Sequence, residues 1–135
     1  ILRTIKYRLY VPRRFESEIN GRNYLDTIFN LPFATLDGGG ELRSAINDLG
    51  LKKKKRIKLE LECSSLNQVA CAIKCGEYCG ILPDSYEEHF EPQILSYSFP
   101  SLSKLDRKIY LVWSRSTLKY KPNISHVVDA IAKAF

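Results

Sequence analysis

The stretch that decides the fold is ELECSSLNQVACAIKCGEYCGILP, residues 60–83. It opens with alternating leucine and glutamate, a pattern that predicts a strand with one solvated face. The sequence SLNQ at 65–68 is typical of a capping box that begins a helix, and Gly76 closes that helix. CGIL at 79–82 then predicts a short buried strand that ends at a proline. A strand, a helix and a strand in this order indicate an α/β fold.

The same pattern continues on both sides of this stretch. Residues 5–11 alternate, with Tyr10 among those expected on the solvated face. The periodicity of 42–49 predicts the clearest helix, with Gly50 at its C-terminal cap, and Asn20-Gly21 is a turn signal. The remaining expected elements are strands at 33–36, 94–99 and 109–113, helical turns at 24–29, and a last helix that opens at Pro122.

Length and composition predict a single globular domain. The chain has 135 residues, of which 44% are hydrophobic and 27% charged, so it can bury a core and is not disordered. No repeat or linker interrupts it, and we expect one domain over residues 1–135. It shows no apolar run long enough to span a bilayer and no secretory leader. Because it begins at Ile1 rather than Met, we expect a fragment of a longer protein.

The chain is basic, with 21 Lys and Arg against 15 Asp and Glu, for a net charge of +6. This balance raises the prior for a nucleic-acid partner. The basic residues are dispersed apart from the run KKKKR at 52–56, which lies between an expected helix and an expected strand. No aromatic residues interleave with the run, so a solvated turn is the simpler interpretation.

No motif indicates catalysis or metal binding. The four cysteines, Cys63, Cys71, Cys75 and Cys79, form no CxxC pair and have no nearby histidine, so we expect free, metal-free, small buried apolar residues. The triple glycine at 38–40 lacks the Gly-Lys-Ser/Thr of a phosphate loop. We therefore predict that the chain is not an enzyme and carries no cofactor.

The order of motifs resembles the effector-binding domain of LysR-type transcriptional regulators. The family's "P-F-I … G … L-R" and "E … V-x-x-G-x-G-I-x-x-L-P" stretches have counterparts, and so does its returning "L-x-L-V-W-R" strand. Tyr78 departs from the pattern, since a glycine usually stands there in the family. The matching segments are IKYRLYVP at 5–12, LPF at 31–33 with ELR at 41–43, the block at 60–83, and IYLVWSR at 109–115.

The resemblance implies the second lobe of that domain, with its two hinge strands and last helix. It implies a lobe like that of type II periplasmic binding proteins, with a central mixed five-stranded sheet flanked by helices. The family's winged helix-turn-helix has no counterpart, so DNA would be bound only through that missing N-terminal part. We expect the parent protein to be a cytoplasmic regulator that forms a homo-oligomer and has no membrane partner.

The predicted effector site lies where two strands end and two helices begin. Open α/β sheets bind ligands outside the carboxyl ends of their strands, and helix N-termini favour anions. We therefore expect a small anionic effector there, although helix capping alone also explains the two serines. The expected contacts are Gly39, Gly40, Ser64, Ser65 and Leu66, with Tyr78 flanking them.

Two other functions stay open at this point. A solute-binding protein of the same two-lobed fold would have no DNA role. A direct nucleic-acid binder would use the +6 charge and the lysine run, but it lacks a recognisable motif.

Overall fold

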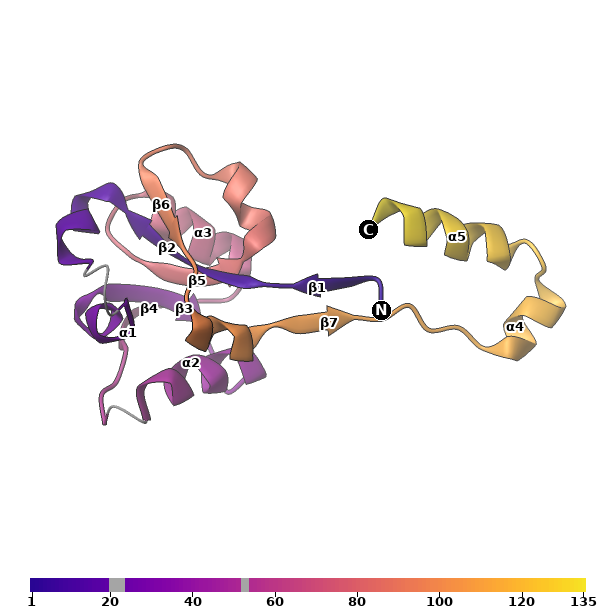
Figure 1. Ribbon diagram of the computed structural model, residues 1–135, viewed down its shortest axis with the longest axis horizontal. Coiled ribbons are helices and arrows are strands. Elements are labelled where there is room, and N and C mark those ends of the chain that lie inside the picture. The colour runs from indigo at the N-terminus through magenta and orange to yellow at the C-terminus, as the bar shows by residue number, and fades with distance from the viewer. Residues whose placement is uncertain (20–23, 52–53) are drawn as a thin grey trace. The chain divides into compact units, whose positions relative to one another are not determined.

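The fold is that of a computed structural model, which describes residues 1–19, 24–51 and 54–135 (Figure 1). The predicted Asn20-Gly21 turn and two lysines of the basic run, Lys52 and Lys53, lie outside these ranges. The chain divides into two compact units, one of Ile1–Ile5 with Arg107–Phe135 and the other of Lys6–Asp106. No helix in the described ranges is long and apolar enough to cross a membrane.

The larger unit has a mixed α/β fold, as the sequence predicts, but its strands do not form one five-stranded sheet. They form an antiparallel sheet in the order β5-β2-β6 and a parallel pair, β3-β4. A single parallel bridge between Phe33 and Cys79 joins the two sheets. One bridge is not a continuous ladder, so the prediction of one five-stranded sheet is wrong. The strands are β2 (Tyr7–Pro12), β3 (Pro32–Leu36), β4 (Lys58–Cys63), β5 (Gly80–Pro83) and β6 (Ile94–Tyr97).

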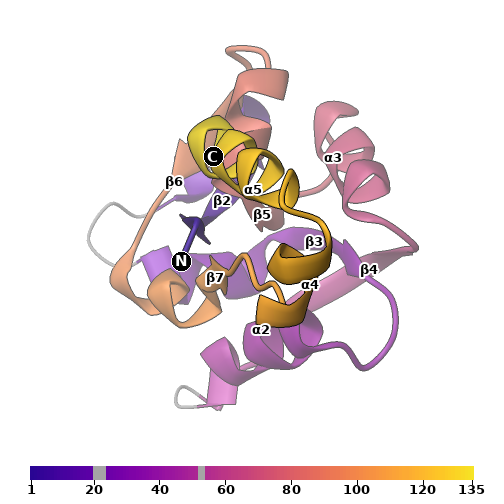
Figure 2. The same cartoon turned by 90° about the vertical axis from the view of Figure 1, so that its right-hand side faces the viewer.

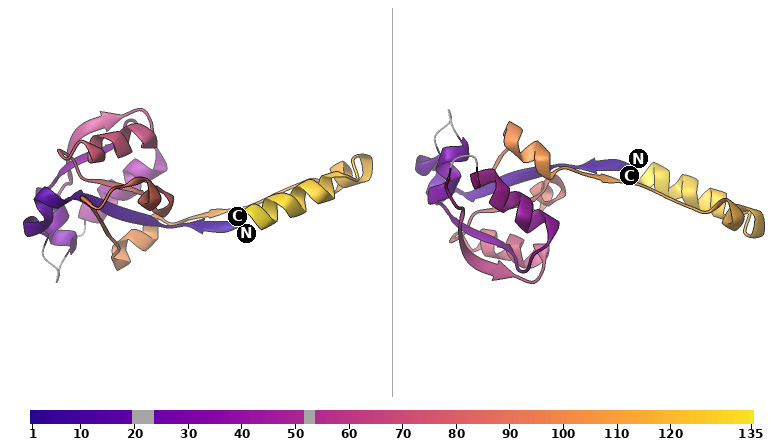
Figure 3. Two further views of the ribbon diagram at one scale, coloured as in Figure 1. Left: turned by 90° about the horizontal axis from the view of Figure 1, so that it is seen from above. Right: turned by 90° about the horizontal axis from the view of Figure 1, so that it is seen from below.

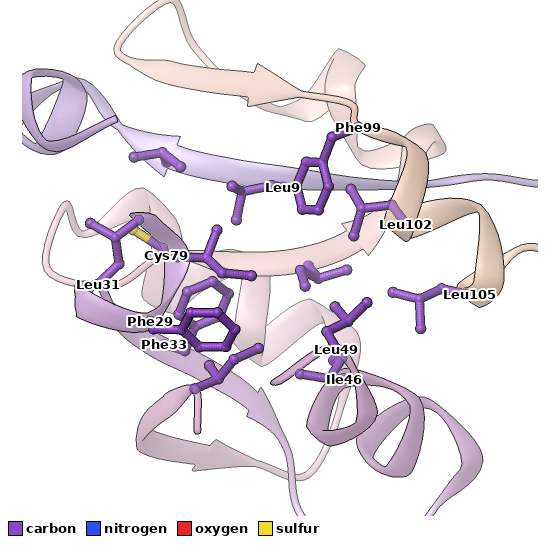
Figure 4. Packing of buried hydrophobic residues seen from close by; sticks show 14 of the residues in the cluster. Leu9, Phe29, Leu31, Phe33, Ile46, Leu49, Cys79, Phe99, Leu102 and Leu105 are labelled. Atoms are coloured by element: carbon purple, nitrogen blue, oxygen red, sulfur yellow. The ribbon is translucent and has the colours of Figure 1, made fainter. Parts of the chain in front are cut away.

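Helices cover both faces of these strands (Figure 2). On one face, Leu9 and Phe33 pack with Ile46 of α2 and with Leu102 of η4 (Figure 4). On the other face α3 packs Val69, Ala70, Ala72 and Ile73 against the strands. The helical segments are η1 (Arg13–Glu18), α1 (Tyr24–Thr27), η2 (Ile28–Asn30), α2 (Glu41–Leu51), α3 (Leu66–Lys74), η3 (Asp84–His89) and η4 (Pro100–Leu105).

Because both faces are covered, Tyr10 is not on a solvated face as predicted. Its side chain is fully buried, and its ring lies 4.7 Å from that of Phe90. Its hydroxyl donates to the carbonyl of Pro83 at 3.2 Å, which satisfies the buried polar group. Burial raises the pKa of Tyr10, with Glu87 adding to the effect. Because polar residues share this face of the strand, the sequence pattern did not indicate that Tyr10 is buried.

The two glycines expected to end helices behave differently. Gly76 follows α3 with a φ of +86°, the left-handed conformation of a C-terminal cap, as predicted. Gly50 lies inside α2, so its predicted capping role is wrong. It is glycine for space, because a Cβ there would stand 2.1 Å from the backbone oxygen of Lys55.

The cysteines are all free, but only Cys63 and Cys79 are buried. Cys71 and Cys75 are exposed, which corrects the expectation that all four are small core residues. The reason is helical periodicity: the buried side of α3 carries Val69, Ala70 and Ile73, and positions 71 and 75 face away from it.

The smaller unit contains a two-stranded antiparallel ladder and two helices (Figure 3). Its strand β7 stops at Ile109, so the predicted strand at 109–113 is wrong beyond its first residue. The ladder ends where Arg3 of β1 pairs with Ile109. Residues after Ile109 therefore have no strand to pair with in the described chain. The elements are β1 (Arg3–Ile5), β7 (Arg107–Ile109), α4 (Arg115–Tyr120) and α5 (Ile124–Ala134).

Candidate functional site

The structure brings two of the predicted segments to one edge of the parallel strand pair. Leu36 of β3 lies opposite Cys63 of β4, and the backbone N–H of Asp37 donates to the carbonyl of Cys63 at 2.9 Å. The glycine run at 38–40 follows β3 and leads into α2, while residues 64–65 follow β4 and lead into α3. The N-termini of both helices therefore lie at the carboxyl ends of neighbouring strands, as expected.

The two serines form the start of α3. The hydroxyl of Ser65 accepts a hydrogen bond from the backbone N–H of Gln68 at 3.2 Å. The side-chain oxygen of Gln68 in turn accepts from the backbone N–H of Ser64 at 2.8 Å. This is the predicted capping box, shifted by one residue on its return bond. Both serines are exposed, so the cap leaves them open to a ligand.

The glycine run leaves the start of α2 open. Gly38 has a φ of +82°, which a side chain rarely adopts, and this turn directs the chain into α2. A Cβ at Gly39 or Gly40 would have no atom within 4 Å. Residues 38–40 are exposed, so this helix N-terminus has room for an anion.

Arg43 holds this edge together. Its guanidinium donates to the carbonyl of Leu36 at 3.0 Å and pairs with the Glu62 carboxylate at 2.8 Å. The side chain is only 18% exposed, and it links α2 to the last residues of both strands. Because its two terminal nitrogens contact two different strands, Arg43 fixes their position relative to α2.

Tyr78 does not join the other predicted site residues. It immediately precedes Cys79, which pairs with Phe33 near the start of β3, at the amino ends of the parallel strands. Its side chain is half-buried and packs against the buried apolar cluster to which α3 contributes. Leu66 also packs on this cluster, but at the start of α3.

A third segment, not anticipated from the sequence, reaches the start of α3. Tyr86 of η3 donates its hydroxyl to the Asn67 side-chain oxygen at 2.6 Å. Since η3 directly follows β5, this places the carboxyl end of a further strand at the same edge. In the sequence the contact is marked only by Asn67 at the start of a helix and a tyrosine three residues after Pro83. Residues of these types are too common for the contact to be predicted without a structure.

A groove of about 380 Å³ lies at this edge, next to the amino end of β2. Tyr7 of β2 pairs with Pro83, the last residue of β5, so the groove belongs to the carboxyl end of the sheet. Its lining combines apolar and polar side chains and was not predicted: Lys6, Tyr7, Ser98, Phe99, Pro100, Leu102, Ser103 and Asp106.

The chemistry of the described residues favours binding. Burial raises the pKa of Cys63, which directly precedes the serines, so its thiol stays protonated and is a poor nucleophile at neutral pH. No group of three or more His, Cys, Asp or Glu in the described ranges could hold a metal ion. The edge offers N–H and hydroxyl donors, which suit a small anion.

No protein-family model matches the chain, and no curated protein sequence does either. Solved structures do match. A variant of the OxyR2 regulatory domain from Vibrio vulnificus matches with a TM-score of 0.70 and 15% identity, over 100% of this chain and 65% of that one. The cofactor-binding domain of the Cbl transcriptional regulator matches with a TM-score of 0.63 and 16% identity, over 88% of this chain and 55% of that one.

CbnR, a LysR family transcriptional regulator, matches with a TM-score of 0.55 and 13% identity. There the match covers 70% of this chain and 34% of CbnR. The chain therefore has the fold found in regulatory domains of LysR-family transcriptional regulators, which confirms the resemblance at the level of fold. It spans just under two thirds of the OxyR2 regulatory domain and about a third of CbnR.

Proposed function

We propose that this chain is the effector-sensing lobe of a LysR-type transcription regulator. The observation that carries the proposal is the fold match to the OxyR2 regulatory domain, which extends over 100% of the chain at a TM-score of 0.70. All three neighbours described above are transcription regulators or their domains, which favours a regulator over a solute-binding protein. The chain performs no catalysis in this proposal.

The proposed effector is a small anion, held by the starts of α2 and α3. The contacts are Gly39, Gly40, Ser64, Ser65 and Leu66, without Tyr78. Each helix N-terminus contributes about 0.3–1 kcal/mol to holding an anion. A neutral hydroxyl hydrogen bond adds about 0.5–1.5 kcal/mol. The sum corresponds to a dissociation constant of millimolar order or weaker, so one lobe alone binds loosely.

A second lobe supplied by the parent protein completes the site in this proposal. The fold is then one lobe of a two-lobed domain of the type II periplasmic-binding-protein kind, and the effector closes the lobes on each other. The exposed apolar side chains of the smaller unit support a missing partner lobe: Tyr110, Val112, Trp113, Tyr120, Val127 and Phe135. Residues 1–135 act as one functional domain, a fragment of that parent.

The parent regulator acts in the cytoplasm as a homo-oligomer and reads DNA through an N-terminal winged helix-turn-helix. CbnR has been crystallised in full length with its target DNA, which is consistent with that division of labour. The +6 charge of this chain gives at most weak, salt-sensitive DNA association.

The test compares the parent protein with this chain on DNA. Mobility-shift assays with the promoter duplex and a scrambled duplex, at low and near-physiological salt, measure specific binding. We expect the parent to bind its promoter selectively and the 135-residue chain to bind neither duplex at the higher salt. Selective binding by the chain itself, or a parent without a winged helix-turn-helix, would contradict the proposal.

A further inference from the structure

A second groove runs along α2, from Arg43 at the effector edge to the segment that begins β4. It has a volume of about 470 Å³, within the range of small-molecule sites. One wall is a stripe on α2, where Arg43, Asn47 and Leu51 recur every fourth residue. The other wall is the start of β4 and the segment before it, which supplies Lys55, Arg56, Ile57 and Leu59.

The groove is cationic over an apolar floor. Three of its lining side chains are cations, and no carboxylate lines it in the part of the chain that the structure describes. Glu62 contacts Arg43 from outside the groove, so one of the three charges is balanced. Lys55 and Arg56 are exposed, while Ile57 is 6% exposed and forms the floor with Leu59. Two other grooves include a carboxylate, Glu91 or Asp106. A third, lined by Arg13, Arg14 and Lys74, is equally cationic but has a volume of only about 190 Å³.

The basic segment is held in place against the helix. Gly50 lets the chain pass close by, and the backbone N–H of Lys55 donates to the carbonyl of Gly50 at 3.1 Å. The ammonium of Lys55 also lies 5.9 Å from the centre of the Phe29 ring. A solvated turn, the interpretation from sequence, needs none of these contacts. Lys55 is therefore held against the helix, which lowers the entropy cost of binding at this position.

We propose that this α2–β4 groove binds a small organic anion with an apolar body, such as an aryl phosphate or aryl carboxylate. The anionic group contacts Lys55 and Arg56, Asn47 donates a hydrogen bond, and the apolar body covers Ile57 and Leu59. A concave site with an apolar floor fits one small molecule better than a nucleic-acid backbone, which needs an extended row of cations. The proposed contacts differ from those of the effector site: Asn47, Lys55 and Arg56 lie along α2 and before β4, whereas residues 64–66 follow the end of β4.

Phenyl phosphate is the probe, and inorganic phosphate and benzyl alcohol each supply half of its chemistry. Amide shifts of the 15N-labelled 135-residue chain are followed during each titration. We expect saturable shifts for phenyl phosphate at Asn47, Lys55, Arg56 and Ile57. Each half-probe should bind at least about tenfold more weakly, because the charge and the burial contribute together.

The double variant Lys55→Gln/Arg56→Gln should weaken phenyl phosphate binding by about tenfold or more. Lys119→Gln/Lys121→Gln removes the same charge from the smaller unit and should change it by less than about twofold. Both pairs are exposed, so the amide spectrum is expected to confirm an intact fold. Unchanged affinity in the first variant overturns the proposal, as does an absence of saturable shifts in the groove. Tighter, salt-dependent occupation of the groove by duplex DNA overturns it in favour of a polyanion surface.

Discussion

Gly80 is the residue at which the sheet approaches α3 closely. A Cβ there would stand 2.7 Å from Cδ1 of Ile73 and 3.2 Å from Cγ1 of Val69, so these side chains of α3 would have to shift within a packed core. We expect Gly80→Ala to lower the free energy of unfolding by about 1–3 kcal/mol, the usual cost of overpacking a core. Gly39→Ala is the matched control, because no atom lies within 4 Å of its added Cβ. Urea denaturation compares them, and equal stability of the two variants would show that α3 does not lie this close.

Because of Cys79, we expect the free energy of unfolding to decrease at alkaline pH. Burial raises the pKa of its thiol to about 12 from 9.0, with Glu18 adding to the effect. The unfolded thiol loses its proton near pH 9 while the folded one keeps it, so the stabilisation is complete below pH 9 and is lost as pH rises toward 12. The slope is at most about 1.4 kcal/mol per pH unit for this one group.

We therefore expect the free energy of unfolding, measured by urea under reducing conditions, to fall between about pH 8 and about pH 10. In Cys79→Ala this fall should be smaller by about 1 kcal/mol, whatever the cavity costs at the lower pH. The raised pKa of Tyr10 leaves a residual decrease at the alkaline end. The same pH dependence in both proteins would mean that Cys79 is accessible to water.

At the scale of the element, the cap of α3 is the contact that the predicted site and the fold share. Ser65→Ala removes the acceptor for the Gln68 N–H and should cost about 1 kcal/mol of stability. Ser64→Ala leaves that bond in place and should change stability by less than about 0.5 kcal/mol. Thermal or urea unfolding of the two variants measures the difference. A Ser64→Ala variant that is the less stable of the two would assign the cap to the wrong serine.

Elements were predictable from sequence where the signal is local. The capping box, the Gly76 terminus and the alternation before Cys63 depend on neighbours within a few residues, and all three are present in the structure. Prediction was wrong where distant segments decide. Tyr10 is buried by a second layer, and Gly50 is needed by the approach of a later segment.

The same distinction holds for the candidate site. The segments at 38–40 and 64–66 could be predicted to meet, because parallel strands bring their carboxyl ends together. Tyr78 was assigned by resemblance, at a position where the family pattern is broken, and it lies at the amino ends of the strands. The Tyr86–Asn67 contact joins residues 19 apart through a short helical segment that has no periodic signal.

At the scale of the whole molecule, the central proposal is an anion-binding edge on a lobe that closes over its ligand only with a partner lobe. Sulfate is a suitable probe, because it is a small anion of the kind that helix N-termini favour. It lacks the apolar body that the α2–β4 groove requires, so it separates the two sites. Lys54→Ala, on the basic side of β4, is the control for Ser64→Ala at the effector edge.

The most direct measurement is a sulfate titration of the 15N-labelled chain at constant ionic strength. The account predicts that the amides of Gly39, Gly40, Ser64, Ser65 and Leu66 shift together along one saturable curve, with a dissociation constant of roughly millimolar order or weaker. Ser64→Ala should raise the dissociation constant by about threefold, because one hydroxyl hydrogen bond is lost, while Lys54→Ala should leave it unchanged. Saturable shifts confined to residues 54–57, with the edge amides unmoved, would contradict it.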